Sequence, residues 1–160
     1  MKRPRGETAT EFTRLVRPAK YEVVRQLNTE IQPLSPYLLQ LNSTSVYHWP
    51  DAPEGAVVLE KGDLVASIEG GAFVIGEFLD DAGDGWVMVV NRDRDRAAWT
   101  TVRLRTPHAL VEEVARSDGH LRSVARDQGV DAVQGYADGS IVRFWLAPAD
   151  SRLMRVRQPA

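Results

Sequence analysis

The feature that most constrains this chain is the alternation of apolar and polar side chains from Thr44 onward, interrupted repeatedly by glycine, aspartate and proline. Alternation of this kind places every second side chain on one face of a β-strand, and short connections favour antiparallel neighbours. Gly70-Gly71, Asp84-Gly85 and Asp138-Gly139 are typical of tight hairpin turns. The pattern predicts these strands: Leu64–Glu69, Phe73–Leu79, Trp86–Asn91, Ala98–Arg105, Leu110–Ala115, His120–Ala125, Ile141–Leu146 and Leu153–Arg157.

These segments predict a mainly β chain, an antiparallel β-sandwich of about eight strands over residues 44–160. The alternation also predicts which side chains are buried. Trp99 and Trp145 fall on the outward face of their strands, with Arg143 beside Trp145. Both faces of Trp86–Asn91 are apolar, which indicates a central strand covered on both sides. The inward side chains of the other two strands are Ala98, Thr100, Val102 and Leu104 in one, and Val142, Phe144 and Leu146 in the other.

The part of the chain before the strands predicts a helix and a helical turn over residues 18–41, preceded by a flexible basic lead-in at residues 1–17. Pro33 and Pro36 end the helix, and residues 42–45 predict a loop. One face of the helix is apolar and needs a cover, either the sandwich itself, a catalytic domain, or a second copy in a homo-oligomer. The residues of this face are Val23, Leu27, Ile31 and Leu34.

Composition excludes several kinds of function. The chain has no cysteine, so it has no disulfide, thiolate zinc site or cysteine nucleophile. Its net charge of −2 gives no electrostatic reason to expect nucleic acid as a partner. Neither a membrane-spanning apolar run nor a signal peptide is recognisable, so no membrane partner is expected and a cytoplasmic location is the default expectation.

The polar residues predict no catalytic residue, no metal site and no cofactor. The three histidines fit no metal motif. Asn91, Asp93 and Asp95 begin like a calcium loop, but Arg96 and Val102 stand where such a loop needs glycine and glutamate. A charged hairpin tip is therefore the better interpretation. Carboxylates also cluster around Glu77 and Asp80–Asp84, and a small hydrolase built on them is a third hypothesis for function.

Aromatic residues supply candidates for glycan stacking, because sugar rings pack on the flat faces of tryptophan and tyrosine. The alternative for each is ordinary packing in the protein interior. The candidates are Trp49, Trp99, Trp145, Tyr47 and His48.

Three stretches carry a resemblance to a known family: residues 21–31 (YEVVRQLNTEI) with 36–39 (PYLL), residues 43–48 (STSVYH), and residues 76–78 (GEF) followed by 87–93 (VMVVNRD). They resemble the C-terminal end of bacterial glycoside hydrolases of the β-galactosidase-like type. There a (β/α)₈ catalytic barrel ends in a helix and is followed by an antiparallel β-sandwich. Catalytic carboxylates of such enzymes lie on barrel strands, and no barrel strand precedes Tyr21.

The resemblance therefore implies a non-catalytic accessory sandwich with a structural or subunit-contact role. The alternative is a carbohydrate-binding module that uses exposed tryptophans.

Overall fold

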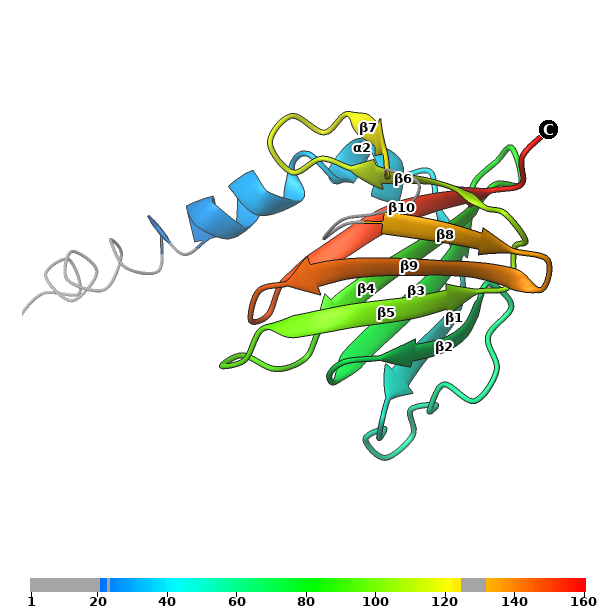
Figure 1. The fold of residues 1–160 in the computed structure, drawn as a ribbon. Helices are drawn as coiled ribbons and strands as arrows, with labels where there is room; N and C mark the ends of the chain where they lie inside the picture. Colours follow the sequence, from blue (N-terminus) through cyan, green and yellow to red (C-terminus); the bar gives the residue numbers. More distant parts are fainter. Residues whose placement is uncertain (1–20, 23, 125–131) are drawn as a thin grey trace, which may run out of the picture.

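The computed structural model describes residues 21–22, 24–124 and 132–160, and within them it has two antiparallel sheets packed face to face (Figure 1). This confirms the predicted antiparallel β-sandwich. The larger sheet contains, in spatial order, β1 (Asn42–Trp49), β3 (Phe73–Leu79), β4 (Gly85–Asn91), β10 (Ser151–Arg157), β6 (Leu110–Val114) and β7 (Leu121–Ser123). The smaller sheet contains β2 (Val65–Glu69), β5 (Ala98–Leu104), β9 (Gly139–Leu146) and β8 (Ala132–Tyr136).

Each of the eight predicted strands has a counterpart, and the structure adds β1 and β8. Residues 42–45, which were predicted as a loop, instead form the first half of β1, so that prediction is wrong. Ser43 is in register with Phe78 of β3, and the Thr44 hydroxyl donates to the Glu77 carbonyl at 3.0 Å. Pairing along the edge of the sheet outweighs the turn preference of these polar residues.

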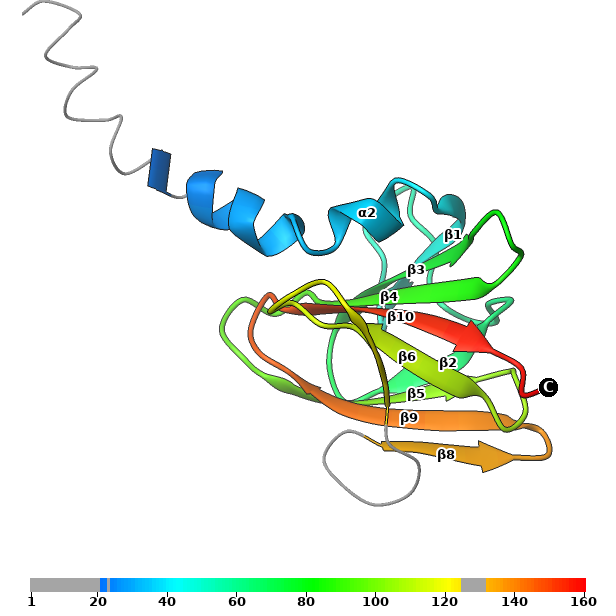
Figure 2. The ribbon, with the colours of Figure 1, turned by 90° about the horizontal axis from the view of Figure 1, so that it is seen from above.

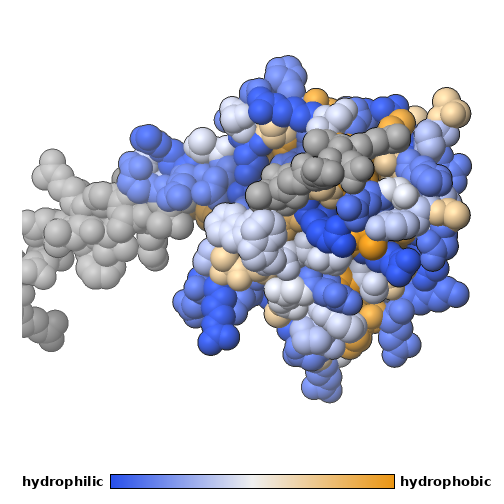
Figure 3. Space-filling view, viewed as in Figure 1, coloured by the Kyte–Doolittle hydropathy of each residue, from blue (hydrophilic) through white to orange (hydrophobic). Residues whose placement is uncertain are grey.

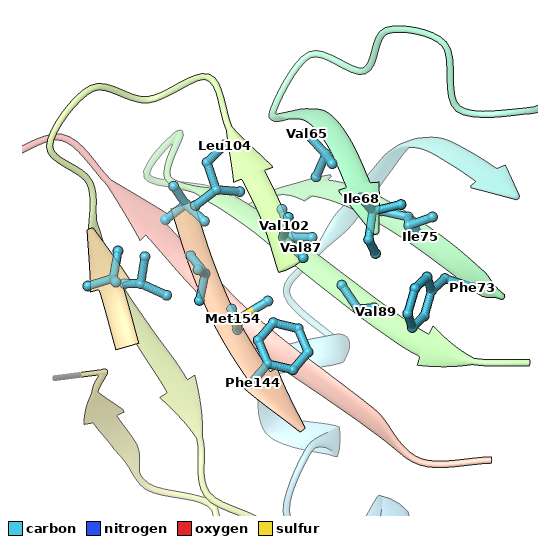
Figure 4. Packing of buried hydrophobic residues seen from close by; sticks show 14 of the residues in the cluster. Val65, Ile68, Phe73, Ile75, Val87, Val89, Val102, Leu104, Phe144 and Met154 are labelled. Atoms are coloured by element: carbon cyan, nitrogen blue, oxygen red, sulfur yellow. The ribbon is translucent and has the colours of Figure 1, made fainter. Parts of the chain in front are cut away.

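The main core lies between the sheets and is built from the inward side chains of both (Figure 4). Burial along β5 and β9 alternates as predicted, with Val102, Leu104, Phe144 and Leu146 inaccessible to solvent. Phe73, Val87 and Val89 meet them from the larger sheet. Each large apolar side chain buried in this way contributes roughly 1.5–3 kcal/mol to stability.

A second apolar cluster covers the outer face of the larger sheet. Trp86 and Leu153 pack against Leu34, which immediately precedes the short helix α2 (Ser35–Leu38). Figure 2 shows α2 beside the larger sheet. The Tyr37 ring packs 5.5 Å from the Trp86 ring, and its hydroxyl donates to the Gly119 carbonyl at 2.8 Å. Strand β4 is thus covered on both sides, which confirms its predicted central place.

The helix that precedes α2 runs away from the sandwich instead of along it (Figures 1 and 2). Residues 24–31 are helical, yet Leu27 and Ile31 are 50% and 51% exposed, whereas Leu34 is 6% exposed. Of the covers expected for the apolar stripe, the sandwich therefore buries Leu34 and does not bury Leu27 or Ile31. Tyr37, Leu38 and Leu41 already fill the space around Leu34.

Val23 and the basic lead-in at residues 1–17 lie outside the described residues. Within the part of the chain that the structure describes, no helix has the length and apolar character to cross a membrane.

Candidate functional site

Two tryptophans stand side by side on the outer face of the smaller sheet. Trp99 of β5 lies directly opposite Trp145 of β9 in the strand register, and the two are 58% and 43% exposed. Directly opposed side chains in an antiparallel pair start about 5 Å apart, so the two indoles lie next to each other on this face, and we call the pair the tryptophan platform. Their immediate chain neighbours, including Ala98, Thr100, Phe144 and Leu146, are buried in the core and fix both strands beneath the platform.

Polar side chains continue the same face beyond the tryptophans. Arg143 of β9 lies opposite Thr101 of β5, and its Nη1 donates to Gln134 Oε1 at 2.9 Å. The Tyr136 hydroxyl donates to the same Gln134 oxygen at 3.0 Å, and Tyr136 is itself exposed. The face thus combines exposed aromatic surface with exposed hydrogen-bonding groups, both of which a site for a ring-shaped polar ligand requires.

The other predicted stacking residues lie elsewhere, on β1 at the edge of the larger sheet. Tyr47 and Trp49 are partly buried and pack against the main core. His48 Nδ1 lies 3.5 Å from Arg92 Nη1, and Arg92 is held by an ion pair with Asp51 at 2.9 Å. The structure therefore brings together Trp99 and Trp145 and separates them from the Tyr47–Trp49 group.

Three members of the candidate site were missed as site residues from the sequence. Arg143 was placed on the same face as Trp145 by alternation, but nothing in its spacing marked it as a ligand contact. Gln134 and Tyr136 belong to β8, a strand that the turn pattern did not reveal. Only the Asp138-Gly139 hairpin signal pointed to a partner strand in this region.

Glu77, the centre of the hydrolase hypothesis, is fully buried on the inner face of the larger sheet. Its Oε1 accepts the N–H groups of Leu64 and Val65 at 3.0 and 2.8 Å, and its Oε2 accepts that of Asp63 at 3.0 Å. Its carboxylate leaves no room for a side chain at Gly62. Glu77 thereby fixes the segment that leads into β2 and ties the two sheets together.

Asp80 closes the β3–β4 hairpin on the opposite side of the sheet from Glu77. Its Oδ1 accepts the N–H groups of Ala82 and Asp84, and its Oδ2 accepts Trp86 Nε1 at 2.9 Å. Burial acts to raise the pKa of Asp80, but these hydrogen bonds, led by that of Trp86, hold it below its ordinary value. Glu77 and Asp80 thus have separate structural partners and do not face each other across a cleft.

The side chains of Asn91, the last residue of β4, and of Asp93 are likewise held by hydrogen bonds within the chain. The buried Asn91 donates from Nδ2 to the carbonyls of Arg96 and Ala147 at 2.8 and 3.0 Å. Asp93 Oδ1 accepts the N–H groups of Asp95 and Arg96, which lower the pKa of Asp93. Among the described residues, no three histidine, aspartate or glutamate side chains come close enough to hold a metal ion.

A hollow of about 310 Å³ lies between β6, β7 and β8 and is a second place where a ligand could bind. Its lining includes Glu112, Ser123 and Arg157. Glu112 accepts hydrogen bonds from Arg155 and Arg157 through Oε2. Since this carboxylate is held between two guanidinium groups, it is poorly suited to act as a general acid or base.

Comparison with solved structures finds a likeness in fold to part of the rhamnosidase from Novosphingobium sp. PP1Y, with a TM-score of 0.45 and 11% sequence identity. The match covers 81% of this chain and 10% of the rhamnosidase chain, so this chain spans about a tenth of the length of that enzyme. No family model and no curated protein matches the chain.

Proposed function

We propose that this chain is a non-catalytic accessory β-sandwich that binds carbohydrate on the outer face of its smaller sheet. The observation that carries the proposal is the exposed cross-strand pair of Trp99 and Trp145. Tryptophan is normally well buried, so two adjacent exposed indoles on a sheet are typical of a surface that binds a ligand. Sugar rings present flat C–H faces to such indoles and hydroxyl groups to the polar residues beside them.

The polarity of the residues exposed on this face favours a polar ligand over an apolar protein partner. Figure 3 looks onto the smaller sheet, and its coloured surface is mostly hydrophilic, with small, separate hydrophobic areas. Stable protein interfaces are built around a continuous, fully buried apolar centre. A platform of two indoles surrounded by polar groups is better matched to one or two sugar units.

The proposed absence of catalysis rests on the carboxylates. A glycosidase needs two carboxyl groups roughly 5–10 Å apart on either side of its substrate. Glu77 is sealed in the interior and Asp80 is bound to its own hairpin and to Trp86. In the glycoside hydrolases of the β-galactosidase-like type that the sequence resembles, the sandwich is also the part without catalytic residues.

Affinity electrophoresis tests glycan binding directly. We expect the chain to be retarded in gels that contain at least one of soluble xylan, mixed-linkage β-glucan and polygalacturonate. Trp99→Ala and Trp145→Ala should each abolish the retardation, because each removes half of the stacking surface. Tyr21→Ala is the matched control, since Tyr21 is an exposed aromatic on the N-terminal helix. Migration unchanged in all three gels would refute the proposal.

A second candidate function, subunit contact, is favoured by the exposed stripe of the N-terminal helix. Val24, Leu27 and Ile31 follow one another at spacings of three and four residues, which suits pairing with the same helix of a second copy. Burial of a few half-exposed side chains per helix gives several kcal/mol, against an association cost of at least about 4 kcal/mol. A weak dimer is the expected product.

Sedimentation velocity over a wide concentration range tests this second candidate. A monomer–dimer equilibrium that Leu27→Glu and Ile31→Glu abolish is expected. A chain that stays monomeric up to high micromolar concentration, or dimerises equally well with either substitution, would exclude the helix as the contact.

A further inference from the structure

We infer that the tryptophan platform selects acidic sugars, with Arg143 as the residue that binds the carboxylate of a uronic acid unit. This inference rests on the proposed glycan binding and deepens it. Its basis is the position of Arg143, two residues before Trp145 on β9 and therefore on the same outer face. Residues so related along a strand are about 6.8 Å apart, close to the width of one sugar ring.

Among the arginines that the structure describes, Arg143 differs from most in what it contacts. Arg103, Arg122, Arg155 and Arg157 each form an ion pair with a carboxylate. For Arg143, among the described residues, no carboxylate lies within ion-pair distance, and its guanidinium donates to the neutral side-chain oxygen of Gln134. The Gln134 contact uses Nη1 and orients the planar guanidinium, which has five N–H donors in all. Donors remain for a ligand.

The remaining charges of this face define where the acid group would lie. Arg103 is on the same face, but its charge is offset by Asp138 at 3.2 Å. Glu69 of β2 lies opposite Thr101, on the far side of β5 from Arg143. Strands two apart in a sheet are separated by about 9.6 Å, so a carboxylate near Glu69 would be repelled and one near Arg143 attracted. The acid group of a bound sugar is therefore expected over β9 and β8.

The chemistry of the pair favours a carboxylate over a hydroxyl as the ligand group. A guanidinium donates two parallel hydrogen bonds to a carboxylate, and such charge-assisted bonds are roughly twice as strong as neutral ones. Gln134 Oε1 accepts from the guanidinium and from the Tyr136 hydroxyl, so the guanidinium is oriented along this face before a ligand binds. Arg143 can therefore donate to the carboxylate while the neighbouring tryptophans stack on the sugar ring.

Polygalacturonate and its fully methyl-esterified form make a matched pair of probes, because they share one backbone and differ in the free carboxylate. Isothermal titration calorimetry should give at least about tenfold tighter binding of the acid form, in line with a hydrogen bond to a charged group. Arg143→Gln should remove that preference, so that the acid form binds no more tightly than the ester. Arg122→Gln, which removes the same charge from β7 on the other sheet, should keep it. Thermal unfolding verifies that each variant is folded.

Four outcomes separate the two proposals. Acid preference that depends on Arg143 and not on Arg122 supports the inference. Equal binding of acid and ester, with both lost in Trp99→Ala, overturns the acid selectivity and leaves glycan binding intact. An equal loss from Arg143→Gln and Arg122→Gln indicates general electrostatic attraction and also overturns it. If Trp99→Ala and Trp145→Ala bind both probes as the wild type does, the platform itself is wrong and both proposals fail.

Discussion

The outer faces of the two sheets both carry tryptophan, but the face of the larger sheet is covered by other residues and that of the smaller sheet is exposed. On the larger sheet Trp86 is 3% exposed, because Leu34 and Tyr37 pack over it and Arg155 lies above its ring at 5.7 Å. On the smaller sheet nothing among the described residues covers Trp99 and Trp145 to that degree. Whether an outward tryptophan belongs to a core or to a surface therefore depends on what the rest of the chain lays over it.

The largest test of this comparison is Trp86→Ala. The substitution removes the largest side chain of the second cluster and its hydrogen bond to Asp80, so we expect a loss of about 3–5 kcal/mol of unfolding free energy. Guanidinium denaturation measures it. If Trp145→Ala costs as much as Trp86→Ala, the distinction between a covered and an open face is lost.

Leu34→Ala tests the cover itself and should cost about 2–4 kcal/mol, because it opens a cavity over Trp86. Leu27→Ala, the matched change on the exposed helix, should stay within about 0.5 kcal/mol. Both values come from the same denaturation experiment on the two variants. Equal costs would indicate that the whole stripe is buried in solution.

Glu77→Gln tests the tie between the sheets. The amide nitrogen of glutamine cannot accept an N–H group, whereas both carboxylate oxygens now accept one or more, so at least one backbone N–H loses its partner. We expect a loss of about 1–3 kcal/mol, and faster hydrogen exchange at Asp63, Leu64 and Val65. Unchanged exchange at these three amides would show that the carboxylate does not hold the segment.

Acidification should lower the stability of the protein through protonation of Asp80, whose carboxylate accepts a hydrogen bond from Trp86. Its folded-state pKa lies below its ordinary value of 3.8, so its contribution to stability is present above that value and is lost as pH falls through the folded-state pKa. Asp80→Asn should therefore lower stability at neutral pH and reduce the further loss on acidification. Denaturation midpoints at neutral pH and at about pH 3 test this. A loss on acidification as large as in the wild type would assign the acid sensitivity to other groups.

A small effect on stability is also expected for Trp99→Ala and Trp145→Ala. Because the two side chains are 58% and 43% exposed, each change should lower the unfolding free energy by about 1 kcal/mol at most, far less than Trp86→Ala. The same variants should lose glycan binding. A large stability cost at either position would mean that the platform is a packing feature.

Alternation predicted the outward placement of Trp99 and Trp145 but not their pairing. Side-chain period is a local property, whereas the match of Trp99 with Trp145 depends on β5 and β9 becoming neighbours, with three strands lying between them along the chain. The same limit explains the missed strands. In β1, Ser43 and Thr44 have turn-like composition and become strand only through β3, and in β8 Gly135 interrupts the pattern.

The place of β10 in the larger sheet has a consequence for biosynthesis. This last strand lies between β4 and β6, so it is inserted at the middle of the sheet and not added at its edge. Until residues 151–157 have left the ribosome, β4 and β6 each present unpaired backbone groups. We therefore expect the nascent chain to need protection from aggregation at this stage, and a stop codon before Ser151 to yield insoluble protein.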